Sequence, residues 1–286
     1  MTSVAYEIVD VFTDRPFTGN PLAVVFGAEE LAGSQMQALA REFNLSETVF
    51  VLPPSPGADA TYRARIFTPN SELPFAGHPS VGAAVTASNR GVFAAGPVVQ
   101  ECGAGLLPVV VSGSTATLTG GVATVGEPLD PGPLLAAVGL TAEDLDPVAP
   151  PRVAGCGLEF PYLPVRPDAV ARARLDSSMS TDVDVFAWDP LTRTAHVRVF
   201  VPGLAVPEDP ATGSAALGLG VWLVTGGLLP ADGESSYVVH QGLELHRPSV
   251  LECVVTAADG AVTNARVTGN VVPIARGEMT VPPFVG

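Results

Sequence analysis

Four side chains that can carry or hold a proton occur in three short segments of the sequence. His78 lies in AGHPS, and Asp209 and Ser214 lie in PEDPATGSA. Glu47 lies in NLSETVF, where a helix is expected to end near Asn44 and an apolar strand to begin. A histidine near a carboxylic acid can transfer protons, and a partly desolvated carboxylate suits general acid or base catalysis. These residue types therefore indicate proton-transfer chemistry.

The segment that contains His78 and the segment that contains Asp209 and Ser214 follow one pattern. Residues 65–84 read RIFTPNSELPFAGHPSVGAA, and residues 198–218 read RVFVPGLAVPEDPATGSAALG. Each has an arginine, a phenylalanine and a proline, then a loop, then Gly77 or Gly213 at the expected start of a helix of small residues. Unpaired N–H groups and the macrodipole attract anions to a helix start, and glycine lets a ligand approach closely. The pattern suits a carboxylate or enolate ligand and predicts two similar halves.

Each of these features also has a purely structural interpretation. Either helix start alone is typical of an ordinary capped helix, Ser214 suits an N-cap and Asp209 suits a turn. A glutamate at the start of a strand, such as Glu47, is usually solvated. Glu72 and Glu208 lie in equivalent loops and are expected at the rim of a site. The repetition of the pattern, with titratable residues in both copies, favours a functional interpretation.

The composition excludes several classes of protein. The 286 residues include 29 acidic and 14 basic side chains, for a net charge of −15, and every basic residue is arginine. Without lysine the chain can form neither a lysine Schiff base nor a Walker phosphate loop, and without a basic patch no nucleic-acid partner is expected. No GxGxxG or GxSxG motif occurs, and the histidines and cysteines lack metal-binding spacings. We therefore expect no metal site and no nucleotide cofactor.

Two stretches without charge, Cys102–Gly126 and Pro210–Ala231, have the length of a membrane span. The first is rich in Gly, Ser and Thr and is typical of a hairpin. The second contains five glycines and is interpreted as a helix buried in a protein core. The chain starts directly with a strand pattern, and its three separated cysteines fit a reducing compartment. The sequence predicts a cytoplasmic protein without membrane contact.

Strand patterns dominate both halves of the chain. The expected strands are Ala5–Phe12, Leu22–Phe26, Thr48–Leu52, Tyr62–Phe67, Val98–Gln100, Leu107–Val111, Thr115–Thr119, Leu158–Val165, Asp184–Asp189, His196–Val201, Tyr237–Gln241, Ser249–Thr256 and Ala261–Thr268. The expected helices are Gln35–Phe43, Pro79–Ser88, Leu134–Val138, Ala169–Arg174 and Ser214–Thr225. For the first helix, Ser34 and Gln37 form a capping-box pattern. The joint between the halves is expected at Val125–Pro133, a segment rich in Gly and Pro.

In these segments the sequence resembles the PhzF family, the phenazine-biosynthesis isomerases and their relatives. The resemblance covers essentially the whole chain and is carried, in order, by DVFTDRPFTGNPLAVVF, MQALAREFNLSETVFV, RIFTPNSELPFAGHPSVG, EDPATGSAALG, and HQGLELHRPSVL followed by VTGN. It implies the α+β, diaminopimelate epimerase-like fold. In that fold two pseudo-symmetric halves, here 1–125 and 126–271, each wrap a curved, mostly antiparallel sheet around a central helix. The active site is expected in the cleft between them, and the tail at about 272–286 is expected to pack onto the first half.

The resemblance also implies an isomerase that moves a proton without a cofactor. In characterised members the substrate is dihydro-hydroxyanthranilate, a small cyclic carboxylate, and a glutamate moves a proton between ring carbons. Glu47 matches that glutamate, and His78, Asp209 and Ser214 match residues that hold the substrate and the proton relay. The partners implied are a small anionic carboxylate and a second copy of the chain, in a homodimer.

Asn20, in GNP, and Ser46 also match family positions near the site. Together with Gly77 and Gly213, whose missing side chains let a ligand approach the backbone, they are expected to contribute to substrate binding.

Two other functions stay open at this point. In related epimerases two cysteines stand at the helix starts. Here His78 and the Gly213–Ser214 pair occupy these places, so cysteine-based racemisation is not expected. An epimerase or racemase of an amino-acid-like substrate with other bases, and a non-catalytic protein that binds small carboxylates, both stay compatible with the sequence. The segment Ala154–Phe160 lacks the charged residues expected opposite the ring of the phenazine substrate, which leaves the substrate open.

Overall fold

The computed structural model describes residues 3–176, 178, 180–203 and 207–283. The chain divides into two compact units: Met1–Leu118 with Thr268–Gly286, and Thr119–Val267. The sequence-based boundaries were placed at 125/126 and 271/272, a few residues further along the chain. The last residues of the tail, 284–286, lie outside the described residues.

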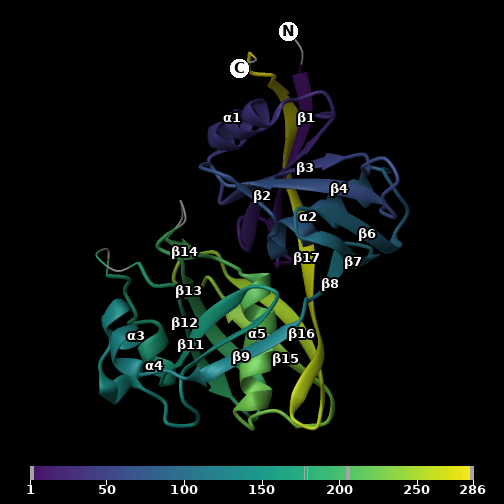
Figure 1. Ribbon diagram of the computed structural model, residues 1–286. Helices are drawn as coiled ribbons and strands as arrows, with labels where there is room; N and C mark the ends of the chain where they lie inside the picture. Colours follow the sequence, from purple (N-terminus) through teal and green to yellow (C-terminus); the bar gives the residue numbers. More distant parts are fainter. Residues whose placement is uncertain (1–2, 177, 179, 204–206, 284–286) are drawn as a thin grey trace. The chain divides into compact units, whose positions relative to one another are not determined.

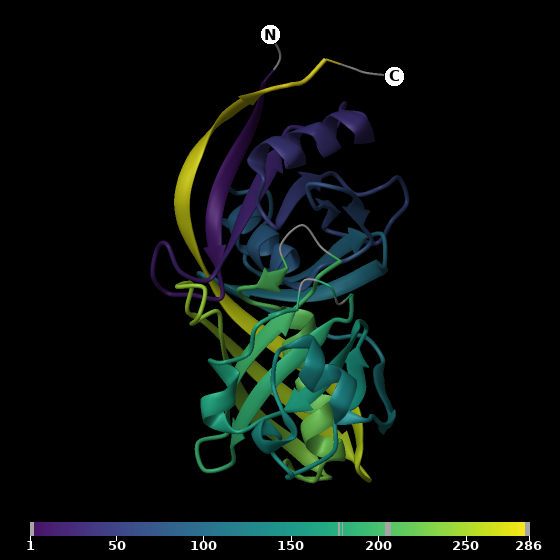
Figure 2. The same ribbon diagram turned by 90° about the vertical axis from the view of Figure 1, so that its left-hand side faces the viewer.

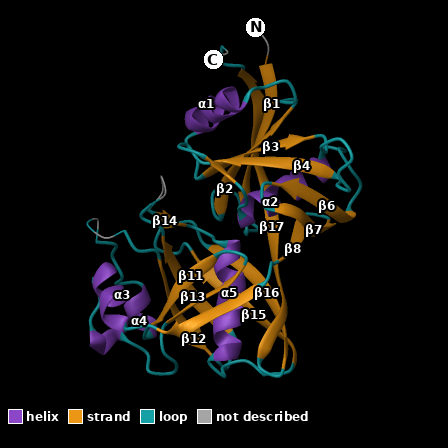
Figure 3. Ribbon diagram, in the orientation of Figure 1, coloured by secondary structure: helices purple, strands orange, loops and turns teal. Residues whose placement is uncertain are grey.

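The first unit contains a sheet and two helices (Figures 1 and 3). Its elements are β1 (Ser3–Val11), β2 (Asn20–Phe26), α1 (Gly33–Phe43), β3 (Glu47–Leu52), β4 (Tyr62–Phe67), β5 (Glu72–Leu73), α2 (Gly77–Asn89), β6 (Gly96–Cys102), β7 (Gly105–Ser112), β8 (Thr115–Thr119) and the second part of β17 (Ala261–Thr280). Neighbouring strands are antiparallel except in the pairs β2–β3 and β4–β6. β17 pairs with both β1 and β8, so the strands close around α2.

From β10 onwards the second unit repeats this order. Its elements are β9 (Ala123–Pro128), α3 (Pro131–Ala137), a 3-10 turn at Ala142–Asp144, β10 (Arg152–Cys156), β11 (Glu159–Pro164), α4 (Pro167–Val170), β12 (Val183–Asp189), β13 (Thr194–Phe200), β14 (Glu208–Asp209), α5 (Gly213–Thr225), β15 (Gly233–Gln241), β16 (Ser249–Ala258) and the first part of β17. Two pairs of this unit, β11–β12 and β13–β15, are parallel as well, and the pairs β10–β11, β12–β13 and β15–β16 are antiparallel. The predicted α+β architecture of two similar halves, each a sheet around one helix, is confirmed.

The joint predicted at Val125–Pro133 is wrong, because this segment lies inside the second unit, which begins at Thr119. Ala123–Pro128 forms strand β9, which pairs antiparallel with β10. The sequence did not predict this strand, because the glycine and proline that it contains are typical of a turn. β10 itself, Arg152–Cys156, was also missed by the sequence analysis.

The last strand is much longer than the predicted Ala261–Thr268. β17 extends to Thr280, and its second part pairs with β1 along Ser3–Val11. Figure 2 shows the two strands side by side. The C-terminal strand therefore belongs to the sheet that begins with the N-terminal strand.

Helix α1 begins earlier than predicted. Its N-cap is Ala32, whose N–H donates to Oε1 of Gln35 over 3.0 Å. Gln37 instead donates its side-chain N–H to the carbonyl of Thr68 over 2.8 Å. The predicted capping box of Ser34 and Gln37 is therefore wrong, because Gln35 reaches back to the backbone first.

The central helices α2 and α5 are buried on all sides because they consist of small and apolar residues. In α5, a Cβ on Gly218 would collide with the hydroxyl of Tyr162, and one on Gly220 with the hydroxyl of Tyr237. Both hydroxyls donate to carbonyls in the first turn of the helix, over 2.6 and 2.7 Å. The sheet thus approaches α5 closely only because these positions are glycine. Among the described residues, no helix is long and apolar enough to cross a membrane.

One acidic side chain lies inside the second unit without compensation. Asp184 in β12 is 1% exposed, and neither carboxylate oxygen has a hydrogen-bond partner among the described residues. Burial raises the pKa of Asp184 well above its usual range. Because the folded state then binds a proton more tightly than the unfolded state, this residue lowers stability as the pH rises above about 4.

We therefore expect Asp184→Asn to stabilise the protein at neutral pH. The amide has the same shape but no charge, so the free energy of unfolding should rise by about 1–3 kcal/mol at pH 7.5. This gain should shrink as the pH falls towards 4, where the unfolded carboxyl is also protonated. Denaturant unfolding from pH 7.5 to 4.5 measures it. Asp14→Asn, at a side chain that is 87% exposed, is the control and should change little. A gain that does not depend on pH would contradict the assignment.

Candidate active site

Glu47 is placed by the junction of a helix and a strand. α1 ends at Asn44, which adopts a left-handed conformation with φ of 51°, and the chain turns directly into β3. Glu47 is the first residue of β3, in register with Leu22 of the parallel strand β2, and is 8% exposed. The expected helix end near Asn44 is confirmed, and the carboxylate lies at a buried strand end.

His78 lies next to this carboxylate. It is the second residue of α2, directly after Gly77, and it is 4% exposed. Its Nε2 lies 3.6 Å from Oε2 of Glu47, slightly beyond hydrogen-bond distance. Burial lowers the pKa of His78 to about 3, partly opposed by a hydrogen bond with the backbone of Pro21. At neutral pH the imidazole is therefore uncharged, and its contact with Glu47 is not an ion pair.

Asn20 and Ser46 hold the far side of this imidazole. Asn20, the first residue of β2, is fully buried, and its Nδ2 lies 3.2 Å from Nδ1 of His78. Ser46 donates its hydroxyl to Oδ1 of Asn20 over 3.1 Å. The first unit thus joins Ser46, Asn20, His78 and Glu47 in one continuous chain of polar contacts. A neutral imidazole fixed beside a buried carboxylate is an arrangement that can relay a proton.

The second unit holds the remaining expected residues around the start of α5. Gly213 and Ser214 are the first two residues of the helix, and both are buried. Asp209 lies in β14, and the hydroxyl of Thr212 donates to its Oδ2 over 2.6 Å. The N-cap position belongs to Thr212, so the interpretation of Ser214 as an N-cap is wrong.

The repeated arginines hold the strands that lead to both helix starts. Arg65 binds both carboxylate oxygens of Glu72 over 2.7 and 2.8 Å, and Arg198 binds both of Glu208 over 2.8 Å. Such a two-point contact fixes orientation as well as distance. Glu72 and Glu208, expected as rim residues, are therefore the anchors of β5 and β14.

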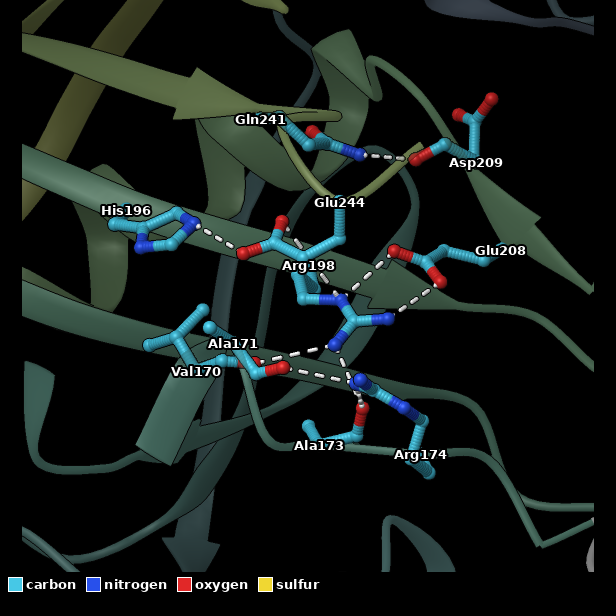
Figure 4. A network of polar contacts seen from close by, with 10 residues as sticks. All are labelled: Val170, Ala171, Ala173, Arg174, His196, Arg198, Glu208, Asp209, Gln241 and Glu244. Atoms are coloured by element: carbon cyan, nitrogen blue, oxygen red, sulfur yellow. Dashed lines mark hydrogen bonds and ion pairs between the residues drawn. The ribbon is translucent and has the colours of Figure 1, made fainter. Parts of the chain in front are cut away.

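A wider network surrounds the second of these pairs (Figure 4). Arg198 also donates to the carbonyls of Val170 and Ala173, and its Nε lies 4.0 Å from Glu244. The other oxygen of Glu244 lies 3.0 Å from Nε2 of His196. Sequence reasoning missed this network, although the repeated arginine was a signal for it.

None of the three cysteines occupies a helix start. Cys102 ends β6, Cys156 ends β10, and Cys253 lies in β16; all three are free thiols. Within the part of the chain that the structure describes, no three His, Cys, Asp or Glu side chains are grouped to hold a metal ion.

Comparison with known proteins identifies the family. The model of the family described as "Phenazine biosynthesis-like protein" matches residues 9–277. The chain belongs to the PhzF family. An uncharacterized isomerase of Mesorhizobium japonicum is 37% identical, over 96% of this chain and 98% of the relative. The trans-2,3-dihydro-3-hydroxyanthranilate isomerase of Pseudomonas aeruginosa is 34% identical over 95% and 98%.

A solved structure shows the same fold. The PhzF-family protein of Bacillus anthracis superposes with a TM-score of 0.88 at 25% identity, covering 98% of this chain and all of that one. The PhzF-family chain thus has the diaminopimelate epimerase-like fold expected from its sequence, and it is an isomerase.

The neutral state of His78 predicts a specific pH dependence of stability. Its pKa is about 3 when folded but near 6.5 when unfolded, so the unfolded state binds more protons between these values. Stability is then fully present above pH 6.5 and falls as the pH decreases towards 3, by up to about 1.4 kcal/mol per pH unit. We expect His78→Gln, which does not titrate, to show a shallower fall than wild type. Urea unfolding of both proteins from pH 7.5 to 4.5 measures this, and parallel curves would contradict it.

Proposed function

We propose that this PhzF-family chain is a cofactor-independent isomerase that moves a proton between carbon atoms of a small cyclic carboxylic acid. The observation that carries the proposal is the buried contact of 3.6 Å between Glu47 and His78. The name of the P. aeruginosa relative supports the substrate class, since trans-2,3-dihydro-3-hydroxyanthranilate is such an acid.

Glu47 acts in this proposal as base and then as acid. Its carboxylate removes a proton from one substrate carbon, electrons move into the adjacent π-system, and the carboxylic acid returns the proton to another carbon. The uncharged state of His78 matters for the first step, because an imidazolium 3.6 Å away would make the carboxylate a weaker base. Asn20 contacts Nδ1 of the imidazole, which keeps Nε2 of His78 directed towards Glu47.

The helix starts bind the anionic oxygens of the substrate in this proposal. The N–H groups at Gly77 and Gly213 are at the positive ends of α2 and α5. Such local sites can bind a carboxylate in a protein whose net charge is −15. Asp209 and Ser214 would accept and donate hydrogen bonds to polar substituents of the ring.

Glu47→Gln should remove turnover and keep the fold. The amide has the same shape but cannot take up a proton, so we expect proton exchange to fall by about 10²–10⁴-fold. Proton NMR in D2O, with trans-2,3-dihydro-3-hydroxyanthranilate and a panel of small cyclic and amino carboxylic acids, measures deuterium entry at carbon. Glu234→Gln, at a side chain that is 59% exposed, is the matched control and should exchange like wild type.

The same experiment separates the alternatives. Binding of a panel compound without any exchange would favour a carboxylate-binding protein and overturn the proposal. Exchange that inverts a stereocentre would indicate an epimerase. Exchange that survives in Glu47→Gln would remove Glu47 from the mechanism.

A further inference from the structure

A buried glutamine holds the loop that carries Asp209. Gln241 is the last residue of β15 and lies in the motif HQGLELHRPSVL, which the proposed reaction does not use. Its side chain is 1% exposed. Its Nε2 donates to the carbonyl of Asp209 over 2.7 Å, and its Oε1 accepts from the N–H of Thr212 over 3.0 Å. One amide therefore bonds both ends of the loop 209–212. Figure 4 shows its contact with Asp209.

The orientation of this amide is determined by its partners. A backbone N–H can only donate and a carbonyl can only accept, so Oε1 faces Thr212 and Nε2 faces Asp209. Nε2 also donates to the hydroxyl of Thr212 over 3.1 Å. Because that hydroxyl has one proton, it directs the proton to Oδ2 of Asp209. The contacts thus run in one direction from Gln241 through Thr212 to the carboxylate.

Neighbouring residues of the same motif hold the middle of the loop. The hydroxyl of Ser249 lies 3.0 Å from the carbonyl of Pro210 and 2.9 Å from that of Arg247, so its one proton is shared between them. Gly242 has φ of 76°, and a Cβ there would collide with the carbonyls of Pro210 and Arg247. The end of β15 therefore passes directly under the loop, which explains why glycine follows Gln241.

The strand before the loop is held from the other side. Glu208 points to Arg198 and forms the two-point ion pair, while the carboxylate of the next residue, Asp209, points away from Arg198 (Figure 4). Side chains of successive strand residues point to opposite faces, so fixing Glu208 also fixes the direction of Asp209. Gln241 then sets the rotation of its carboxylate through Thr212.

We propose that Gln241 is a positioning residue that orients the Asp209 carboxylate for the isomerase reaction. This inference rests on the role given to Asp209 in the proposed function. Gln241 touches the Asp209 carbonyl and the Thr212 hydroxyl, so its removal acts on the reaction through Asp209.

The test is a double-mutant cycle with solvent exchange as the readout. Gln241→Leu should lower kcat/KM for trans-2,3-dihydro-3-hydroxyanthranilate by about 10–100-fold in the wild-type background. In the Asp209→Asn background the same change should cost less than about threefold, because the orientation of the acidic group is then already lost. Thr212→Val should lower kcat/KM to a similar extent, because it removes the hydroxyl. Thr212→Ser, which keeps the hydroxyl, should retain most of the wild-type kcat/KM. Equal losses in both backgrounds would indicate a merely structural role and overturn the proposal.

A matched control and a structural readout complete the test. Gln35→Leu removes the bonds of another glutamine to backbone groups, at Ala32 and Pro282, and should leave turnover unchanged. Crystal structures of Gln241→Leu and Gln35→Leu report the Thr212–Asp209 contact without any substrate. An intact contact in Gln241→Leu overturns the positioning role. A displaced Asp209 in an otherwise folded Gln241→Leu protein supports the positioning role. This structural result does not depend on turnover, so it still holds if wild type does not isomerise the compound and the proposed function is wrong.

Discussion

One helix is buried inside the curved sheet of each unit, and the residues at the starts of α2 and α5 depend on this constraint. A helix that is wrapped by strands on all sides must be largely apolar and must carry small residues where a strand comes close, and α2 and α5 meet both conditions. At Gly218 and Gly220 even a methyl group would collide with a tyrosine hydroxyl. Burial also decides the chemistry at the helix start, because the second residue of each helix, His78 or Ser214, is enclosed with it.

The same physical effect acts in opposite directions on two titratable groups. Burial keeps His78 uncharged by lowering its pKa, and it favours the protonated form of Asp184 by raising its pKa. The histidine is held by Asn20 and lies beside Glu47, so its neutral state serves the proton relay of the proposed reaction. Asp184 has no hydrogen-bond partner among the described residues, and for it the same burial only lowers stability.

Local patterns predicted the residues whose position depends on neighbours in sequence. Glu47 was placed at a buried strand start because the helix before it ends at Asn44, and the repeat around Arg65 and Arg198 predicted two similar halves. Gln241 could not be found in this way, because a single glutamine carries no periodicity and its partner loop lies some thirty residues earlier. Strand β9 could not be predicted for a similar reason, since it is defined by its pairing with β10, a segment distant in the sequence.

The frames of the two units are alike, so the functional differences must lie where the repeats diverge. Each repeat keeps the arginine, its carboxylate partner and the glycine at the helix start. The following residue is His78 in one unit and Ser214 in the other. Exchange at a stereocentre with two bases requires a proton acceptor on each side, and a serine hydroxyl does not provide one at neutral pH without an adjacent base. Among the described residues, the first unit places an imidazole beside a carboxylate at its helix start, whereas the histidine–carboxylate contact of the second unit, His196 with Glu244, belongs to the network of Arg198. This asymmetry favours proton transfer by one base, Glu47, over racemisation by two.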